Sequence, residues 1–347
     1  MDKINNSYEN DLRLVFEKDL PWDELSGQNI LVTGATGLIG GCLVDTLMNN
    51  PQRNYHVYAS GRDKKIEERF CCYARDKYFH FLIYDVLNPL NCDIRFDYII
   101  HAASYASPKF FIENPVEIIK ANIDGVIHLL EYGIKHKMKR FLYISSGEIY
   151  GESQSELLKE DDSGYVDCLK PRSCYPSSKR AAETLCASYI EEYGVDVVIA
   201  RPCHVFGPNF SKKDNRVYAQ FIRNIIEDSD IIMKSSGEQY RSWCYVVDCV
   251  SALLCILLRG KTGHAYNIAD KNATITIKEL AELIAEIGGK KVKMVVPAES
   301  ESKGYNVVMR SVFSTEALES LGWSVEGEIK DKFEKTIRHE REKLRRE

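Results

Sequence analysis

The sequence of 347 residues predicts an α/β fold, in which helices cover both faces of a parallel sheet. Three observations lead to this expectation. Short segments that are apolar throughout alternate with segments of helical periodicity, a glycine-rich turn follows the first apolar segment, and the rhythm changes after Arg201-Pro202. The first two are typical of strands buried on both faces, and the third indicates a second, smaller lobe.

The first part of the chain alternates strands and helices in regular order. Short apolar segments predict strands at residues 29–33, 55–60, 79–84, 97–101, 140–145 and 195–200. Apolar residues that recur every three to four positions predict helices at residues 38–48, 116–136 and 175–193. Residues 1–27 are polar with scattered aromatic side chains, and we expect them to form an arm or short helix packed on the domain.

The second part of the chain has shorter and more mixed elements. We expect helices near residues 217–227 and 277–287, the latter with Thr276 as its cap, and strands at 231–234, 237–245 and 291–296. The charged end, 330–347, is expected to be a helix with a solvated face. The domains we predict are an N-terminal arm (1–27), a dinucleotide-binding domain (28–203, with a return segment at about 239–270) and a substrate-binding lobe (204–238 and 271–347).

Composition excludes several other classes of protein. Hydrophobic residues make up 44% and charged residues 28%, as in an ordinary globular protein. The net charge of -5 gives no reason to expect nucleic acid or an anionic membrane as a partner. The eleven cysteines form no CxxC pair and no paired spacing with histidines, so we expect no metal site and a reducing cytoplasm. The start of the chain has no apolar signal core, and no window approaches the roughly 18 apolar residues of a membrane span.

The segment 33–40, TGATGLIG, carries glycines in the pattern GxxGxxG directly after a strand and at the start of a helix. Glycines allow the tight turn, the close approach of the backbone to a pyrophosphate and close helix–strand packing, and the phosphate lies at the helix N-terminus. A glycine-rich turn without a ligand is the alternative, but the strand–turn–helix context holds on both sides. We therefore predict a Rossmann-type doubly wound parallel sheet with a smaller mixed α/β C-terminal substrate lobe, and a dinucleotide held by Gly34, Thr36, Gly37, Leu38, Ile39 and Gly40.

The ends of the next strands extend this nucleotide site. Gly61 stands where an NAD site usually has an acid for the ribose, and Arg62 follows; an arginine there suits a 2′-phosphate, which gives a slight preference for NADP over NAD. The alternative is that Arg62 is solvated and Ser60 contacts the ribose. We expect Asp85 and Val86 to contact the adenine, and the end of the fourth strand to line the cofactor cleft with Ala102, Ala103 and Ser104.

Three residues further along the chain suit hydride chemistry on a sugar hydroxyl. Tyr175 lies four residues before Lys179, and Ser146 belongs to an upstream serine pair. A tyrosine that loses its proton near neutral pH must have its pKa lowered by about three units from ~10, which corresponds to roughly 4 kcal/mol. A lysine one helical turn away can supply part of this and an oxidised nicotinamide most of the rest. Alone the spacing is weak, but with the serine and the nucleotide motif it indicates a dehydrogenase-type site.

These motifs together resemble the extended short-chain dehydrogenase/reductase family, in its nucleotide-sugar epimerase/dehydratase branch. The resemblance covers residues from about 28 to 325. Its landmarks are the glycine turn, His101–Ser104, Asn122–Gly125, Ser145–Gly151, Tyr175–Lys179, Arg201–Pro208 and Arg241–Asp248. It implies a nucleotide-diphosphate sugar as substrate, Asn122 in the cofactor site and a homodimer formed by helices 116–136 and 175–193. These helices carry apolar residues on more than one face, although deep packing on the sheet would also explain them.

Two stretches, His101–Pro108 with Asn114-Pro115 and Pro171–Tyr175 with Lys179–Thr184, look closer to UDP-glucuronate decarboxylases. In that branch and in sugar 4,6-dehydratases, the residue matching Glu148 is an active-site acid or base. Oxidation of the sugar at C4 acidifies the C5 proton, which a carboxylate can remove, and it also makes a C5 carbanion feasible as carbon dioxide leaves. A solvated or structural role is the alternative for Glu148. Glucose-type dehydratases have an aspartate where this chain has Gly147.

The resemblance also indicates which side chains bind the substrate. Arg241 resembles an arginine aimed at the diphosphate or the sugar acid, and Arg216 is a candidate helper, although either could be a surface arginine. His204 replaces an asparagine of the family and could equally be a packed structural residue. The expected substrate-binding set is Ser104, Ser146, His204, Asn209, Arg216 and Arg241.

These residues define a predicted catalytic cycle. Tyr175, as phenolate, takes the C4 hydroxyl proton while hydride moves to the nicotinamide of NAD or NADP; Lys179 lowers the pKa of the tyrosine, and Ser146 orients the hydroxyl. Glu148 then acts at C5, and hydride returns to the intermediate. The alternatives are a 4-epimerase, which does not need Glu148, a 4-ketoreductase and, outside enzymes, a catalytically silent scaffold that senses a dinucleotide.

Overall fold

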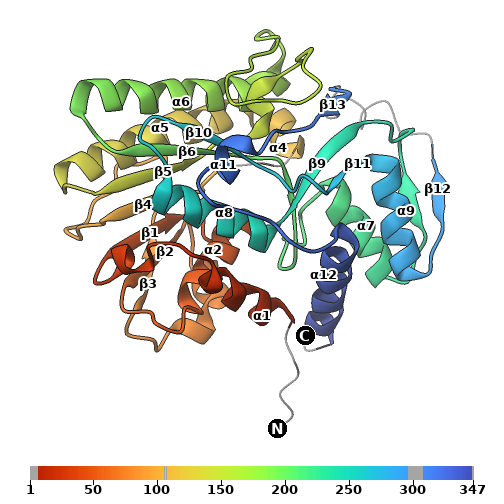
Figure 1. Cartoon of the computed structure of the whole chain (residues 1–347), viewed down its shortest axis with the longest axis horizontal. Coiled ribbons are helices and arrows are strands. Elements are labelled where there is room, and N and C mark those ends of the chain that lie inside the picture. The colour runs from red at the N-terminus through yellow and green to blue at the C-terminus, as the bar shows by residue number, and fades with distance from the viewer. Residues whose placement is uncertain (1–6, 105, 107, 296–307, 346–347) are drawn as a thin grey trace.

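The largest sheet has seven strands, all parallel, and forms the centre of the molecule (Figure 1). The computed structural model describes residues 7–104, 106, 108–295 and 308–345. In spatial order the strands are β10 (Ala265–Ile268), β6 (Val197–Pro202), β5 (Arg140–Ile144), β4 (Tyr98–His101), β1 (Asn29–Thr33), β2 (His56–Gly61) and β3 (Phe79–Ile83). The predicted α/β class with a parallel sheet is confirmed.

The strand order reverses between β1 and β4, which pair in register from Ile30 with Tyr98 to Thr33 with His101. In an open α/β sheet the crevice at such a reversal, beyond the carboxyl ends of the strands, is where ligands bind. The glycine-rich turn follows β1 and the segment 102–104 follows β4, so both open into this crevice.

Helices cover both faces of the sheet (Figure 1). On one face α2 (Leu38–Met48) packs beside α8 (Val246–Arg259), and on the other α5 (Pro115–Lys135) packs along α6 (Cys174–Tyr193). The sequence pattern did not predict α8. Almost all of its residues are buried, so it lacks the polar face that reveals a helix in a sequence.

A second, smaller group of elements stands at the carboxyl end of the sheet. Its core is a four-stranded sheet, in which β9 (Tyr240–Tyr245) pairs with β7 (His204–Phe206), β11 (Thr274–Thr276) and β13 (Arg310–Ser311). β8 (Ile231–Met233) and β12 (Val292–Met294) form a separate pair beside the helices α7 (Val217–Ile226), α9 (Ile277–Gly288) and α12 (Ile329–Leu344). Thr276 caps α9 as predicted, since its hydroxyl accepts from the backbone N–H of Glu279 at 3.1 Å. The other α-helices of the described residues are α1 (Ser7–Leu14), α3 (Lys65–Arg69), α4 (Pro108–Glu113) and α11 (Glu316–Glu319).

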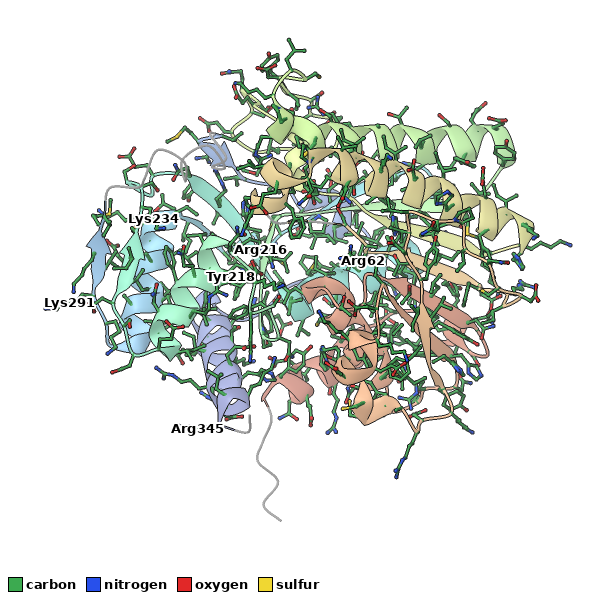
Figure 2. All side chains as sticks on the ribbon, turned by 180° about the vertical axis from the view of Figure 1, so that it is seen from behind. Arg62, Arg216, Tyr218, Lys234, Lys291 and Arg345 are labelled. Carbon is green, nitrogen blue, oxygen red and sulfur yellow. The ribbon has the colours of Figure 1, made fainter. Side chains whose placement is uncertain are left out.

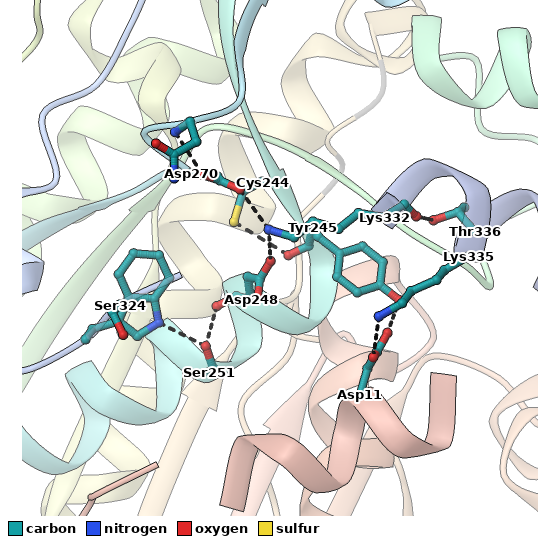
Figure 3. Close-up of polar contacts among 12 residues, drawn as sticks. Asp11, Cys244, Tyr245, Asp248, Ser251, Asp270, Ser324, Lys332, Lys335 and Thr336 are labelled. Carbon is teal, nitrogen blue, oxygen red and sulfur yellow. Dashed lines mark hydrogen bonds and ion pairs between the residues drawn. The ribbon is translucent and has the colours of Figure 1, made fainter. Parts of the chain in front are cut away.

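Helix α1 lies against both parts of the chain. The hydroxyl of the buried Tyr8 donates to Asp45 of α2 at 3.2 Å, and Asp11 pairs with Lys335 of α12 at 2.7 Å (Figure 3). The structure therefore places a packed helix within the predicted arm; residues 1–6 lie outside the described residues. In the part of the chain that the structure describes, no helix is long and apolar enough to cross a membrane.

Helix α12 was correctly predicted as a helix, but the expectation that it is simply solvated was wrong. Phe333 is fully buried and stacks on Phe206 with ring centroids 3.8 Å apart. The Lys332 ammonium lies between the carboxylates of Asp248 at 2.9 Å and Asp270 at 2.8 Å (Figure 3). The acids that accommodate this charge come from α8 and from the end of β10, so the charges of α12 alone gave no sign that one face is covered.

Replacing Lys332 by alanine should destabilise the protein by about 3–5 kcal/mol, because the change leaves two buried carboxylates without their cation. Lys330→Ala is the matched control, since Lys330 pairs with Glu286 on an exposed part of the same helix. Urea unfolding measures both. Equal and small losses for the two variants would contradict a structural role for the Lys332 contacts.

Candidate active site

A cavity of about 1000 Å³ lies where the carboxyl ends of the sheet strands meet the second group of elements. Its wall contains most of the predicted catalytic and substrate-binding residues: Ser104, Ser146, Glu148, Tyr175, Lys179, His204, Arg216 and Arg241. The fold thus brings together side chains that are far apart in the sequence. Of the predicted substrate-binding set, Asn209 alone does not line this cavity.

The glycine-rich turn fits a bound dinucleotide. Gly34 has a positive φ of 68°, and a Cβ there would stand 2.6 Å from the Cα of Ala103. A Cβ on Gly40 would stand 2.3 Å from the carbonyl oxygen of Gly34, so neither position has room for a side chain. Gly37 caps the start of α2 and is exposed, while Ile39 in its first turn lines the cavity. The helix N-terminus therefore opens at the cavity, as a pyrophosphate requires.

Of the other predicted cofactor residues, Ala102 and Ser104 line the cavity, whereas the residues at the ends of β2 and β3 do not. A Cβ on Gly61 would meet Thr36 at 3.4 Å, so the end of β2 lies directly under the glycine turn. Arg62 follows on the exposed surface of the nucleotide domain, across from Arg216 and Tyr218 in Figure 2. The Asp85 carboxylate accepts from the backbone N–H of Leu87 at 3.1 Å, and the carbonyl of Val86 contacts His128 at 3.0 Å. Their contacts with a cofactor stay predictions.

A short chain of hydrogen bonds joins the end of β4 to the start of α6. The Ser104 hydroxyl donates to Asn122 at 2.8 Å, and the Asn122 amide donates to the Ser178 hydroxyl at 2.9 Å. Ser178 in turn donates to the carbonyl of Tyr175 at 3.1 Å. Asn122 is buried, and its observed contacts position α6, the helix that carries Tyr175. Its predicted contact with a cofactor would have to pass through Ser104.

Tyr175 and Lys179 are both buried in the wall of the cavity. Burial raises the pKa of the Tyr175 phenol to about 12, with a further rise from the Glu148 carboxylate. A hydrogen bond with Ser146 and the charges of Arg216 and Arg172 act in the opposite direction. Burial also lowers the pKa of Lys179 to about 7, and its ammonium donates to the carbonyl of Ile144 at 2.8 Å. The protein alone therefore keeps the phenol neutral and makes the charged form of the lysine less favourable, so an additional positive charge would help to activate the phenol.

Glu148 is held by Arg172, which sequence reasoning missed as a site residue. The two carboxylate oxygens of Glu148 accept from the two terminal nitrogens of Arg172 at 2.6 and 2.9 Å. Glu148 lies in a 3₁₀ turn (Gly147–Tyr150), and its backbone N–H donates to the Ser146 hydroxyl at 3.1 Å. In the sequence, Arg172 stands out only because it lies three residues before Tyr175. That position does not indicate that its partner is Glu148, which lies 24 residues earlier.

Gly147 is required by packing. A Cβ at this position would stand 2.3 Å from the ring of Phe313, which arrives from the far end of the chain. An aspartate therefore fits here only if Phe313 moves. This gives a physical reason for the departure from the glucose-type dehydratases noted in the sequence.

The two predicted substrate arginines differ in how their charges are balanced. Arg216 forms an ion pair with Asp214 at 2.6 Å and contacts the Tyr218 hydroxyl at 2.9 Å. Arg241 is buried and donates to backbone carbonyls, at 2.9 Å to Tyr240 and 3.2 Å to Met309. Burial lowers the pKa of Arg241 to about 10. Among the described residues no carboxylate pairs with Arg241, so an anionic ligand would complete its environment.

His204 and Asn209 have different surroundings. Burial lowers the pKa of His204 to about 3, so the ring is neutral, and its Nδ1 has no partner among the described residues. It lines the cavity beside Trp243. The Asn209 side chain instead contacts α12, through His339 at 3.3 Å and Lys343 at 3.4 Å. We therefore do not carry Asn209 into the proposed substrate site.

A buried polar network holds the segment from Ser145 to Tyr150, which includes the 3₁₀ turn with Glu148. Glu183 pairs with Arg201 at 2.6 Å and accepts from the Ser145 hydroxyl at 2.5 Å. Arg201 also donates to the Tyr150 hydroxyl at 3.0 Å, and Tyr150 donates to Asn267 at 2.6 Å. The network fixes both ends of the segment that carries Ser146 and Glu148. Within the described residues no cluster of three or more metal-ligating side chains occurs.

Comparison with protein-family models matches residues 30–269 to the NAD dependent epimerase/dehydratase family. The chain belongs to this family. The resemblance seen in the sequence is thereby confirmed, and the protein is an NAD-dependent nucleotide-sugar enzyme of the epimerase, dehydratase and decarboxylase group.

Two curated relatives are similar to this chain over most of their length. The chain is 32% identical over 308 residues to UDP-glucuronic acid decarboxylase 6 of Arabidopsis thaliana, which covers 88% of this chain and 87% of that protein. It is 30% identical over 325 residues to UDP-glucuronic acid decarboxylase 1 of Xenopus tropicalis, which covers 92% of this chain and 74% of the relative.

Solved structures of the family share the fold. UDP-glucose 4-epimerase from Thermotoga maritima, solved with UDP-glucose, has a TM-score of 0.77 at 25% identity and covers 91% of this chain and 99% of its own. A UDP-glucuronic acid 4-epimerase from Bacillus cereus, solved with UDP-glucuronic acid and NAD, has a TM-score of 0.77 at 22% identity and covers 91% and 99%. A dTDP-glucose 4,6-dehydratase from Streptomyces venezuelae, solved with NAD, has a TM-score of 0.79 at 22% identity and covers 90% and 97%.

The lowered pKa of Lys179 predicts how stability depends on pH. Its pKa is about 7 in the fold, against about 10.4 for a solvated lysine, so between these values the folded protein binds fewer protons than the unfolded chain. The free energy of unfolding of the cofactor-free protein, relative to Lys179→Met, should therefore rise from pH 7 to pH 9 by up to about 1.4 kcal/mol per pH unit. Urea unfolding at both pH values measures this; a difference that does not change with pH would show that the charge is accommodated in the fold.

Proposed function

We propose that this enzyme oxidises a nucleotide-sugar at C4 and then acts at C5, with hydride returned to the intermediate. The observation that carries the proposal is the position of Glu148. It lies in the 3₁₀ turn that Ser146 caps, and it lines the same cavity as Tyr175 and Lys179. A carboxylate next to the hydroxyl-binding serine stands where chemistry at the neighbouring carbon requires one.

The residues of the chain divide the work in the proposed cycle. When bound, the cofactor accepts and returns a hydride at its nicotinamide. Tyr175 takes the proton of the C4 hydroxyl, and Ser146, which acts to lower the pKa of Tyr175, orients that hydroxyl. Lys179, anchored on the carbonyl of Ile144, stabilises the phenolate. Glu148 acts at C5, and Arg241 binds a negative charge of the substrate.

Decarboxylation of a nucleotide-linked uronic acid is the reaction we favour. The packing of Phe313 on Gly147 leaves no room for the second acid of a glucose-type dehydratase. The two curated relatives reported above are UDP-glucuronic acid decarboxylases. The steps balance: the C4 hydride leaves, the bond from C5 to the carboxylate breaks, a proton is added at C5 and the hydride returns, so that one proton is consumed and one carbon dioxide released. A 4-epimerase is the second candidate, because it needs Ser146 and Tyr175 but not Glu148.

The preference between NAD and NADP is also a proposal. NAD is typical of the family. The exposed Arg62 at the end of β2 supports NADP as the alternative, since a guanidinium there suits a 2′-phosphate.

Product analysis tests the reaction. The protein is incubated with NAD and, separately, UDP-glucuronate, UDP-glucose and dTDP-glucose, and products are identified by mass spectrometry. We expect a product lighter by one carbon dioxide from UDP-glucuronate. Loss of water would indicate a dehydratase, and a product of unchanged mass with a new retention time an epimerase.

Two substitutions test the catalytic assignments. Tyr175→Phe should lower kcat by about 10²–10⁴-fold, because the group that takes the C4 proton is removed. Glu148→Gln should lower the release of carbon dioxide while C4 oxidation, seen as transient nicotinamide absorbance, continues. A Glu148→Gln enzyme with full activity would rule out the role at C5 and favour the epimerase.

We also propose a homodimer through α5 and α6. Of the apolar residues on α5, Ile118, Leu129 and Leu130 are buried within the chain, whereas Val116 and Ile119 are exposed. Introducing glutamate at Val116 and Ile119 together should halve the mass found by sedimentation. Met294→Glu, at an exposed apolar residue of β12, is the control. A wild-type chain that sediments as a monomer would overturn the proposal.

A further inference from the structure

The Glu148 carboxylate is fully engaged in the structure. Both of its oxygens accept from Arg172 in a two-pronged contact, at 2.6 and 2.9 Å. Such paired bonds between a guanidinium and a carboxylate are among the strongest side-chain contacts. A carboxylate held in this way is a poor partner for the substrate, so the resting site keeps its C5 group occupied.

Aromatic packing holds the guanidinium group of Arg172 in the wall of the cavity. Its guanidinium lies over the ring of Phe111, 5.1 Å from the centroid, and Phe111 stacks on Tyr175 at 4.6 Å. The Nε of Arg172 is buried and has no hydrogen-bond partner among the described residues. The head group thus depends on what its terminal nitrogens bind, because the surrounding protein supplies no other acceptor that the structure describes.

Three arginines line the cavity, and each has a different kind of partner. Arg216 is neutralised by Asp214, which has no place in the proposed chemistry. Arg241 donates to backbone carbonyls and, among the described residues, forms no ion pair, although the charge of Glu148 acts on it; it is the arginine we propose for an anion of the substrate. Arg172 alone of the three is paired with an acid that the proposed reaction uses.

The location of the pair relates it to a particular part of the sugar. Ser146, which is proposed to hold the C4 hydroxyl, accepts a hydrogen bond from the backbone of Glu148. The carboxylate and its arginine are therefore next to C5 and its substituent. If that substituent is itself a carboxylate, it meets the negative charge of Glu148 unless a cation stands between them. Among the cations that line the cavity, Arg172 is the one already in contact with Glu148.

We propose that Arg172 determines specificity by exchanging partners: it leaves Glu148, with which it is paired in the structure, and binds the sugar carboxylate in the substrate complex. The inference rests on the proposed function, which it deepens. A sugar with an acidic group at C5 displaces Glu148 from the fork and so frees the residue that acts there. A neutral sugar cannot compete for the guanidinium and leaves Glu148 paired. Recognition of the substrate charge and release of the C5 group are then one event.

Binding measurements test the exchange without turnover. Isothermal titration of the NAD-loaded protein, with Tyr175→Phe in every variant to prevent chemistry, compares UDP-glucuronate with UDP-glucose. Arg172→Gln should weaken UDP-glucuronate by at least about tenfold and change UDP-glucose by less than about twofold. Lys159→Gln is the control for lost positive charge, since Lys159 forms an exposed pair with Glu316 and its side chain is not part of the cavity lining. Equal effects on both ligands would overturn the proposal.

Removal of the competing acid gives the opposite change. Glu148→Gln should strengthen UDP-glucuronate binding about three- to tenfold, because Arg172 no longer leaves a charged partner, and the gain should vanish in the double variant with Arg172→Gln. A merely structural Arg172 would not produce this reversal. Unchanged or weaker binding by Glu148→Gln would overturn the exchange.

A further variant and a turnover assay distinguish failure of the exchange from failure of the proposed function. Arg172→Lys retains the positive charge but not the two-pronged guanidinium, so it should bind UDP-glucuronate with an intermediate affinity. This variant provides a test even if Arg172→Gln folds poorly. Absence of turnover by the wild-type protein would reject the proposed function but leave the binding comparison intact. Normal turnover with no selective loss in Arg172→Gln or Arg172→Lys would reject the exchange alone.

Discussion

The close approach of the glycine turn to the end of β4 is the constraint on which the site depends. A Cβ on Gly34 would collide with the backbone of Ala102 and Ala103, so the turn after β1 lies directly on the segment after β4. Ser104 continues that segment and is bonded through Asn122 to Ser178, at the start of the catalytic helix. One line of contacts therefore runs from the expected pyrophosphate position to Tyr175. The nucleotide turn and the catalytic helix are positioned by the same few atoms.

The ionisable side chains in the cavity are either paired with an opposite charge or lack one that a ligand would supply. Burial holds both Tyr175 and Lys179 toward their neutral forms, with the pKa of the phenol raised and that of the amine lowered. A bound oxidised nicotinamide would supply the positive charge that the phenolate lacks, and the diphosphate the negative charge that Arg241 lacks. Glu148 and Arg172 satisfy one another for the same reason. A cofactor and a substrate would therefore each bring the charge that one of these groups lacks.

The local patterns of the sequence predicted most of the first part of the fold, because strands and helices there are set by periodicity and by glycine; β1 and α2 have the predicted bounds. Prediction failed where long-range contacts decide. Helix α8 is buried all round, and α12 hides Lys332 between acids that other elements supply. In the site, the sequence marked Glu148 but missed Arg172, since their pairing exists only after α6 packs beside the catalytic turn. Gly147 was noted as a departure, and its cause became visible only with Phe313 in place.

Phe313 shows how a distant segment can limit the chemistry of a shared site. The residues proposed to oxidise C4 lie at the ends of the sheet strands and on α6. What happens at C5 depends on which acids stand near that carbon. Phe313 belongs to the segment after β13, and its ring occupies the space beside Gly147 where a second acid would stand. It also packs with Tyr150, which is fixed by the buried network under the turn. An aspartate at position 147 would therefore have to displace a packed ring, so a residue from the second part of the chain limits which side chains fit next to Glu148.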